Sequence, residues 1–455
     1  MLILFFSSCF KDETLYYYMS SSNTNALALI DCNNFFVSCE RAVNKELQNR
    51  PVVVLSNNDG CIISRSNEVK ALGVKMAEPL FQVRELLEKH NTAIISCSHA
   101  LYRDFANQIH TILSEDLGKD VVELYSIDEA FVDVGPPDKL KLLGDHVKHL
   151  ILEKTGIPVS VGTAETKTLA KLANNIAKTS VKANGVLDLY NSPYTDLALK
   201  QTEVGKIWGI GRRSVAHLKE HGINTAFELK NSDPEKIRSY LNVFGARTVM
   251  ELNGIKCLPL EIIEKDNRSI AHTRTFGQTI SNFQEIKNAI FYFTTRALEK
   301  MRWNDLTAKV VTVYLQTDRF RPEPRYYSQA YSYNSVYYSD ITSEIYQWIA
   351  ICLDKVFQPN MQYKRAGIVL SGLAPASSAS LRLYGQADFE RRHRLVKSID
   401  ELNLRYGRDV IRFAALNDNG GWQSTSTHRD NDANHHIDRN MLGLGKTFSK
   451  SVRFL

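Results

Sequence analysis

Two adjacent acids stand inside an apolar stretch, and they restrict the possible structures of this chain more than any other feature. Residues 124–134 carry Asp128 and Glu129 among apolar and β-branched residues that favour a buried strand. Neighbouring carboxylates in such a setting repel one another and lose hydration, so a bound cation would stabilise them. An acid pair on a turn that faces water is the simpler interpretation, and these residues alone leave it open.

A third acid occurs in a similar context near the start of the chain. Residues 26–30 are a short apolar run followed by Asp31, which predicts a core strand that delivers this carboxylate to a site at its edge. Three carboxylates from two separate strands can hold two divalent ions roughly 3.5–4 Å apart for phosphoryl transfer. Oxygen ligands and phosphate substrates favour Mg²⁺, so we expect Asp31, Asp128 and Glu129 to bind two Mg²⁺ ions.

Five motifs then occur in a fixed order, and together they are similar to those of one enzyme family. They cover residues 28–36, 56–61, 125–130, 166–174 and 208–213. They resemble the UmuC branch of the Y-family translesion DNA polymerases, the branch of the catalytic subunit of bacterial DNA polymerase V. The resemblance implies error-prone, template-directed addition of dNTPs to a primer 3′-hydroxyl by two-metal phosphoryl transfer, within the bacterial SOS response to DNA damage.

The resemblance also implies an α/β (α+β) multidomain fold with the right-hand arrangement of a polymerase. The expected parts are a palm (26–35 and 98–190), small fingers (36–97), a helix-hairpin-helix thumb (191–258), a linker (259–271), a βαββαβ-like little finger (272–372) and a C-terminal extension (373–455) that binds a partner or is mobile. Residues 1–25 are an N-terminal extension. Because residues 1–18 have no counterpart in the family, we expect translation to start at Met19.

A basic helix is predicted over residues 166–179, where Lys167, Lys171 and Lys178 alternate with apolar residues. A solvated basic face is the usual meaning of such a pattern. In the family, the lysine that matches Lys178 reaches the triphosphate of the incoming nucleotide. The resemblance places Lys70 and Arg65 at further nucleotide-binding positions.

Phe36 lies five residues after Asp31, where the family has its steric gate. The resemblance implies that this ring lies beneath the sugar and excludes a 2′-hydroxyl. An aromatic side chain that simply packs at the end of a strand is the alternative.

A DNA-binding hairpin is expected within residues 204–218. Gly209 and Gly211 allow a tight bend that presents N–H groups to a phosphate, and Arg212 and Arg213 follow directly. A plain turn between helices is the alternative. Residues 242–247 suggest a weaker second hairpin. Further candidate contacts to the DNA backbone, each of which could be an ordinary surface charge, are Arg274, Lys309, Arg319, Arg321 and Arg325.

The C-terminal extension carries an altered version of a family motif. Ser380, Leu381, Leu383 and Tyr384 stand where the family has a sliding-clamp peptide, Gln-Leu-x-Leu-Phe. Because the anchoring amide is replaced by a hydroxyl, we expect clamp binding to be weak. The resemblance adds a processed UmuD-like dimer and a recombinase filament as partners. One helix is expected near residues 391–406 of an otherwise mobile tail.

Composition restricts the class of protein only loosely. The net charge of +6, from 56 Lys+Arg against 50 Asp+Glu, permits nucleic-acid binding without requiring it. The seven cysteines form no Cys-x-x-Cys pair, which fits a reducing cytoplasm, and we expect a cytoplasmic, nucleoid-associated protein. Two other functions stay open: a nucleotide cyclase with a palm-like domain, and a DNA-binding regulator without catalytic activity.

Overall fold

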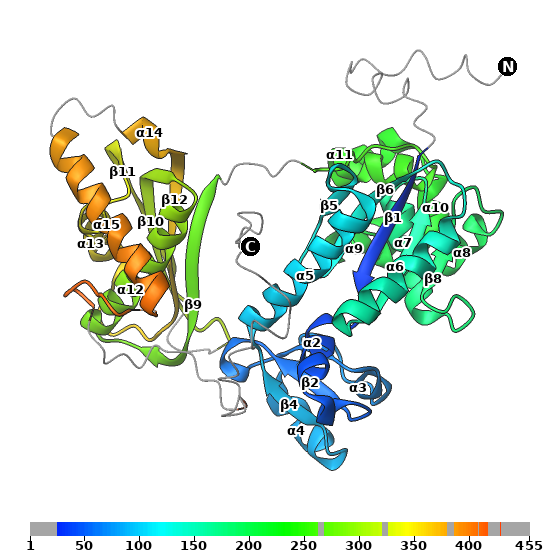
Figure 1. Cartoon of the computed structure of the whole chain (residues 1–455), viewed down its shortest axis with the longest axis horizontal. Helices are drawn as coiled ribbons and strands as arrows, with labels where there is room; N and C mark the ends of the chain where they lie inside the picture. Colours follow the sequence, from blue (N-terminus) through cyan, green and yellow to red (C-terminus); the bar gives the residue numbers. More distant parts are fainter. Residues whose placement is uncertain are drawn as a thin grey trace. The chain divides into compact units, whose positions relative to one another are not determined.

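The computed structural model describes residues 25–262, 268–320, 326–379, 386–407, 409–416 and 428. The chain divides into two compact units, the larger formed mainly by residues up to 264 and the smaller mainly by residues 265–429. Figure 1 labels their helices and strands. Within the described ranges, no helix is both long and apolar enough to cross a bilayer.

A five-stranded sheet with the order β5-β6-β1-β7-β8 lies at the centre of the larger unit. Its strands are β1 (Ala26–Cys32), β5 (Val122–Leu124), β6 (Glu129–Gly135), β7 (Val159–Ala164) and β8 (Val186–Asp188). Every residue of β1 is buried, and successive residues point to opposite faces of the sheet. Ala28 and Ile30 therefore enter one core, whereas Leu29 enters a second core.

Helices cover both faces of this sheet. α5 (His99–Leu117) and α6 (Leu140–Thr155) contribute to the core that contains Ile30, and α7 (Lys167–Thr179) contributes to the core that contains Leu29. Gly162 of β7 permits α7 to lie unusually close, because a Cβ atom there would come within 2.2 Å of the Asn174 nitrogen. The structure therefore fixes the position of α7 against the central strands.

Two smaller groups of elements complete the larger unit. The first is a three-stranded sheet with helices beside it: α2 (Phe35–Val43), η1 (Lys45–Leu47), β2 (Val52–Leu55), β3 (Ile62–Arg65), α3 (Asn67–Ala71), α4 (Leu80–Lys89) and β4 (Ala93–Ser96). The short turn η2 (Asn57–Asp59), between β2 and β3, is grouped with the smaller unit. The second is helical: α8 (Thr195–Gln201), η4 (Val204–Lys206), α9 (Arg212–Glu220), α10 (Ala226–Lys230) and α11 (Pro234–Leu252). One further short turn, η3 (Lys119–Val121), precedes β5.

A buried carboxylate joins the helical group to α7. Glu251 is fully buried and accepts hydrogen bonds from the backbone N–H groups of Thr168, Cys257 and Leu258, at 2.8–3.1 Å. These charge-assisted bonds satisfy donors at the start of α7 and in the chain that follows α11. The last helix of the group is thus held against the central sheet.

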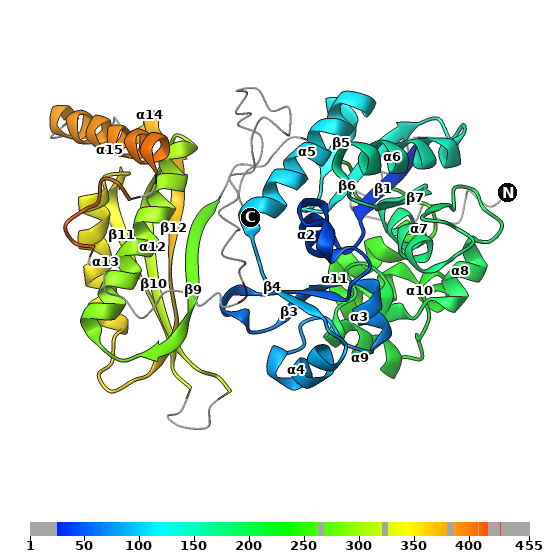
Figure 2. The ribbon, with the colours of Figure 1, turned by 60° about the horizontal axis from the view of Figure 1, so that its bottom comes forward.

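The smaller unit has the element order β-α-β-β-α-β that the sequence predicts. Its antiparallel sheet, with the order β11-β10-β12-β9, contains β9 (Ser269–Ile280), β10 (Leu306–Thr317), β11 (Ser328–Ser339) and β12 (Tyr363–Pro375). Figures 1 and 2 show α12 (Phe283–Trp303) and α13 (Thr342–Val356) on one face of this sheet, where they enclose an apolar core. α14 (Ala376–Ala379) and α15 (Gln386–Tyr406) follow.

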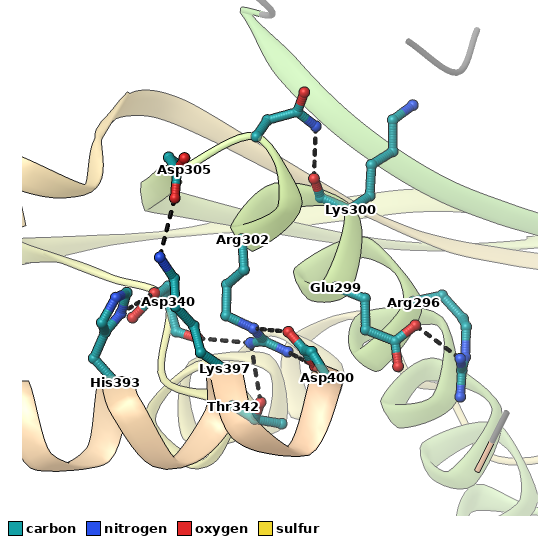
Figure 3. Close-up of polar contacts among 11 residues, drawn as sticks. Arg296, Glu299, Lys300, Arg302, Asp305, Asp340, Thr342, His393, Lys397 and Asp400 are labelled. Atoms are coloured by element: carbon teal, nitrogen blue, oxygen red, sulfur yellow. Dashed lines mark hydrogen bonds and ion pairs between the residues drawn. The ribbon is translucent and has the colours of Figure 1, made fainter. Parts of the chain in front are cut away.

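Polar contacts attach α15 to the rest of the smaller unit (Figure 3). Arg302, at the end of α12, donates from Nε and Nη2 to the Asp400 carboxylate at 2.6 and 2.9 Å, and from Nη1 to the Asp340 carbonyl at 2.8 Å. His393 pairs with Asp340 at 2.5 Å, and Lys397 with Asp305 at 3.0 Å. The helix predicted near residues 391–406 is confirmed, and it is docked rather than part of a free tail.

Three expectations about local structure were wrong. The predicted continuous strand around Asp128 is a hairpin, because the chain turns at residues 125–128 and the Tyr125 and Ser126 N–H groups bond to the Glu129 carbonyl at 3.1 and 3.0 Å. The last residues of the expected linker, from Ser269, belong to β9. In the expected helix-hairpin-helix, the element directly before the hairpin is only the short turn η4 rather than an α-helix.

Candidate active site

Asp31 and Glu129 come together because their strands are neighbours. β1 and β6 pair in antiparallel register with Asp31 opposite Glu129. Asp31 lies two residues after Leu29, and Glu129 two residues before Phe131, so both acids share the sheet face that α7 covers. Asp31 is only 6 % exposed. The structure thus brings two of the three predicted acids onto one face.

Asp128 lies beside these acids but not in the same orientation. Its carbonyl accepts a hydrogen bond from the Cys32 N–H at 2.9 Å, and its carboxylate accepts one from the Ser126 hydroxyl at 2.7 Å. Asp128 lies in the turn before β6, and the bond from Ser126 holds its carboxylate within that turn. Among the described residues, no three acidic, histidine or cysteine side chains form a ready-made metal cage.

Two lysines of α7 neutralise the paired acids. Lys178 Nζ lies 2.5 Å from Asp31 Oδ2, and Lys171 Nζ lies 2.9 Å from Glu129 Oε1. Burial raises the pKa of Asp31 to about 7, Lys178 opposes this shift, and the neighbouring Glu129 adds to it. Each buried carboxylate is therefore matched by one lysine, and the oxygen donors of the pair are of the kind that fits Mg²⁺.

Three cations gather next to Asp31. Burial lowers the pKa of Lys70, and repulsion from Arg65 and Lys178 lowers it further, whereas Asp31 acts in the opposite direction. The Nε atom of Arg65 is buried, and no atom of the described residues accepts a hydrogen bond from it. Like charges held together with an unsatisfied donor favour an anion, so this cluster can bind a polyphosphate.

Phe36 is the second residue of α2. The helix follows Asn34, which has a left-handed backbone conformation, and begins at Phe35. Its ring stacks on Tyr102 of α5 with a centroid distance of 4.4 Å and an interplanar angle of 18°. The Tyr102 hydroxyl donates to Glu40 at 2.6 Å, which fixes the ring beneath. The side chain is half-buried, so one part of the ring packs while another part is open to a ligand.

The predicted hairpin in the helical group has the expected local geometry. Gly209 has a φ of +84°, a conformation that favours glycine, and Gly211 caps the N-terminus of α9. Arg212 and Arg213 begin that helix and are exposed. Farther along, α11 is interrupted at Asn242, where φ is 67° and the side chain accepts a hydrogen bond from the Phe244 N–H at 2.9 Å. The second, weaker hairpin is thus a kink between two helical segments.

The remaining predicted residues are scattered or lie outside the described residues. Arg274 is half-buried on β9, Lys309 lies over the Tyr338 ring at 5.8 Å, and Arg319 lies over Phe320 at 5.4 Å. The residues that the structure does not describe are Arg321, Arg325, Ser380, Leu381, Leu383 and Tyr384.

The sequence matches two models of one family. The impB/mucB/samB family matches residues 30–175, and the C-terminal domain of the same family matches residues 267–383. The protein UmuC of Salmonella typhimurium is 34 % identical over 400 residues, which cover 87 % of this chain and 94 % of that protein. The chain belongs to the UmuC branch of the Y-family DNA polymerases.

Two more comparisons extend this result. A DNA polymerase IV of Moorella thermoacetica is 29 % identical to this UmuC-type polymerase over 407 residues, which cover 87 % of the chain and 97 % of that protein. The solved structure of a Y-family DNA polymerase chimera of Dbh and Dpo4 has a TM-score of 0.61 at 22 % identity, covering 77 % of this chain and 99 % of that one. The right-hand polymerase fold is therefore confirmed.

Sequence reasoning missed how this UmuC-type polymerase uses the lysines of α7. A solvated basic face is wrong for Lys167, which is 3 % exposed and forms a buried ion pair with Glu123. Lys171 pairs with Glu129 in the same way. The sequence did contain a signal for these ion pairs. Lys167 and Lys171 are four residues apart and so share a helix face, and Glu123 and Glu129 stand on either side of the turn between β5 and β6. What the sequence lacked was the turn that brings Glu123, opposite Phe131, and Glu129 onto one face of the β5–β6 pair.

Proposed function

We propose that this polymerase carries out error-prone, template-directed addition of dNTPs to a primer 3′-hydroxyl past damaged bases, in the bacterial response to DNA damage. The observation that carries the proposal is the pairing of Asp31 with Glu129 across β1 and β6, next to the cation cluster of Arg65, Lys70 and Lys178. An acid pair beside a polyphosphate site is the arrangement that phosphoryl transfer requires.

Each residue then has a distinct role. Asp31, Asp128 and Glu129 would hold two Mg²⁺ ions, for which the Asp128 carboxylate, bonded to the Ser126 hydroxyl, supplies the third set of oxygens. Bound Mg²⁺ would activate the primer hydroxyl and stabilise the departing pyrophosphate. Lys70, Lys178 and Arg65 bind the triphosphate, for which Lys178 must exchange its carboxylate partner for phosphate oxygens.

Other residues select the sugar and hold the DNA. Phe36, supported from below by Tyr102, excludes the 2′-hydroxyl of a ribonucleotide. The N–H groups near Gly209 and Gly211, with Arg212 and Arg213, contact phosphates without reading sequence. Residues 26–35 and 98–190 form the palm, 36–97 the fingers, 191–258 the thumb, and 272–372 the little finger, joined by a linker that runs through 259–268 and is followed by β9.

Primer extension with Mg²⁺ and dNTPs tests this function. Asp31→Asn and Asp128→Ala are each expected to slow extension by about 100-fold or more, because each removes a charged ligand of the reacting groups. Asp138→Asn, at an exposed position after β6, is the matched control and should retain the parent rate. Near-parent extension by Asp128→Ala would contradict the assignment.

The same assay separates the other two functions and tests the partners. A cyclase would form a product from free NTP without primer, and a regulator would bind primer-template without adding a nucleotide. We further propose that a processed UmuD-like dimer, a recombinase filament and a sliding clamp assist this polymerase at the bacterial nucleoid. Extension past an abasic template should increase when the dimer and filament are added.

A further inference from the structure

The Lys171–Glu129 ion pair is enclosed by aromatic rings. Lys171 Nζ lies 4.8 Å from the centroid of the Tyr125 ring and 5.4 Å from that of the Trp208 ring. Such distances allow a cation–π attraction to both rings. Nζ also lies 2.9 and 3.0 Å from the two oxygens of the Glu129 carboxylate. The Lys171 ammonium group is therefore held by the Glu129 carboxylate and by the two aromatic rings.

The rings of this enclosure come from different parts of the larger unit. Tyr125 stands in the turn before β6, and Trp208 in the predicted thumb hairpin directly before Gly209. The indole N–H of Trp208 donates to the Tyr125 hydroxyl at 3.1 Å, and the two rings meet edge to face at 5.4 Å. A chain of contacts thus leads from the hairpin to a catalytic acid.

The pair is well shielded but not sealed. The Lys171 and Glu129 side chains are 19 % and 15 % exposed, whereas those of the structurally similar Lys167–Glu123 pair are 4 % and 7 % exposed. Lys167 also donates a hydrogen bond to the Pro259 carbonyl at 2.8 Å. The Lys167–Glu123 pair therefore joins three segments of the fold and has a structural role. Lys171 has only Glu129 and the rings as its described partners, and a ligand can reach the carboxylate.

We propose that Lys171 is a positioning residue for Glu129. The Lys171 ammonium group holds the Glu129 carboxylate towards Asp31 until a divalent cation displaces it. Through Trp208, Lys171 also links the thumb hairpin to the catalytic acids. This inference rests on the proposed function. The Lys171 ammonium group contacts both carboxylate oxygens that a metal ion would bind, so it competes with the metal. At the same time it keeps the Glu129 carboxylate oriented.

Metal affinity gives the decisive test, because a merely structural lysine would not raise it when removed. In the full chain without DNA or nucleotide, Lys171→Met should bind Mn²⁺ about fivefold more tightly by calorimetry, since no ammonium group must be displaced. Its kcat for primer extension should fall about tenfold with little change in the KM for dNTP, because the carboxylate is less well oriented. Lys171→Arg should restore both values towards those of the parent.

Controls separate the possible failures. Lys182→Met, which removes an exposed cation just beyond α7, should leave metal affinity and kcat unchanged. Lys171→Gln replaces the methionine variant if the latter does not fold. Trp208→Phe should tighten Mn²⁺ binding about twofold by weakening the enclosure, whereas Trp303→Phe, at an exposed tryptophan of α12, should not. Unchanged or weaker binding by both Lys171 variants would overturn the inference. A parent protein without saturable Mn²⁺ binding would overturn the proposed function itself.

Discussion

At the scale of residues, charge balance dominates the candidate site. Asp31 has Lys178 on one side and Glu129 on the other, while Lys70 and Arg65 add positive charge nearby. Burial makes each of these charges costly unless it is matched by another.

Phe36→Ala is expected to admit ribonucleotides. Without the ring that stacks on Tyr102, nothing fills the space expected beneath the sugar, so discrimination between dNTP and rNTP should fall on the order of 100-fold. Single-nucleotide insertion kinetics with dCTP and CTP measure the ratio. Phe81→Ala, at a phenylalanine that is 78 % exposed on α4, is the control and should keep the parent ratio. Unchanged sugar selection by Phe36→Ala would assign the ring to packing alone.

The raised pKa of Asp31 makes the fold sensitive to pH when metal is absent. Because the pKa rises from 3.8 to about 7, the folded state binds this proton more tightly than the unfolded state. The resulting stability is complete below pH 4 and is lost as the pH rises through 7. In EDTA, Asp31→Asn should therefore be more stable than the parent by about 1–3 kcal/mol at pH 8, and by less at pH 5. Denaturant unfolding at both pH values measures this, and a difference independent of pH would contradict it.

At the scale of elements, close packing between β7 and α7 positions the lysines. Asn174 is fully buried and donates to the Leu29 and Ser160 carbonyls at 3.2 and 2.8 Å, so α7 is bonded to both central strands. Contacts of this kind leave no room for additional atoms. In the smaller unit, α15 is attached by ion pairs and by Phe389 and Val396, which pack against Ile341.

Gly162→Ala is expected to destabilise the larger unit by about 3 kcal/mol or more, because its Cβ would overlap backbone atoms of Asn174 and Ala170. Thermal or denaturant unfolding measures the loss. Gly60→Ala, where the nearest atom would lie 3.8 Å away, should change stability by less than about 0.5 kcal/mol. A tolerated Gly162→Ala would mean that α7 can shift away from β7.

Arg302→Met is expected to release α15 without unfolding the sheet. The arginine is 4 % exposed, and its loss would leave Asp400 without its bidentate partner and the Asp340 carbonyl without a donor. Amide exchange over residues 389–406 should become at least about tenfold faster, while that of α13 stays slow. Arg391→Met, at an exposed position of the same helix, is the control. Unchanged protection of α15 would show that Phe389 and Val396 suffice to hold it.

Prediction from sequence succeeded where local pattern decides the structure. The apolar run before Asp31, the strand that begins at Glu129, and the helix over residues 167–179 all followed from local residue types and spacing. The turn at residues 125–128 was missed because its apolar and β-branched residues favour a strand, although Ser126 bonds to the N–H groups of Asp128 and Glu129 and stabilises a bend. Pairings such as Lys171 with Glu129 depend on tertiary packing, which no local pattern encodes.

At the scale of the whole molecule, each of the two units has its own core. The smaller unit contains one large apolar cluster between its sheet and helices and a small one around Ile341, Phe389 and Val396, and the larger unit contains three others. Units with separate cores commonly unfold separately. We therefore expect two transitions in calorimetry. Gly162→Ala should lower the temperature of one transition and leave the other unchanged, whereas a single transition that shifts as a whole would indicate that the units unfold together.

The complete burial of β1 has a consequence for how the gene can vary. A strand paired on both edges and packed on both faces cannot absorb an added codon locally, because every following side chain would change faces. One inserted residue between positions 26 and 30 would direct the position of Asp31 into the apolar layer beneath the sheet. Length variation among natural or engineered sequences should therefore collect in surface loops such as residues 180–185 and spare this strand entirely.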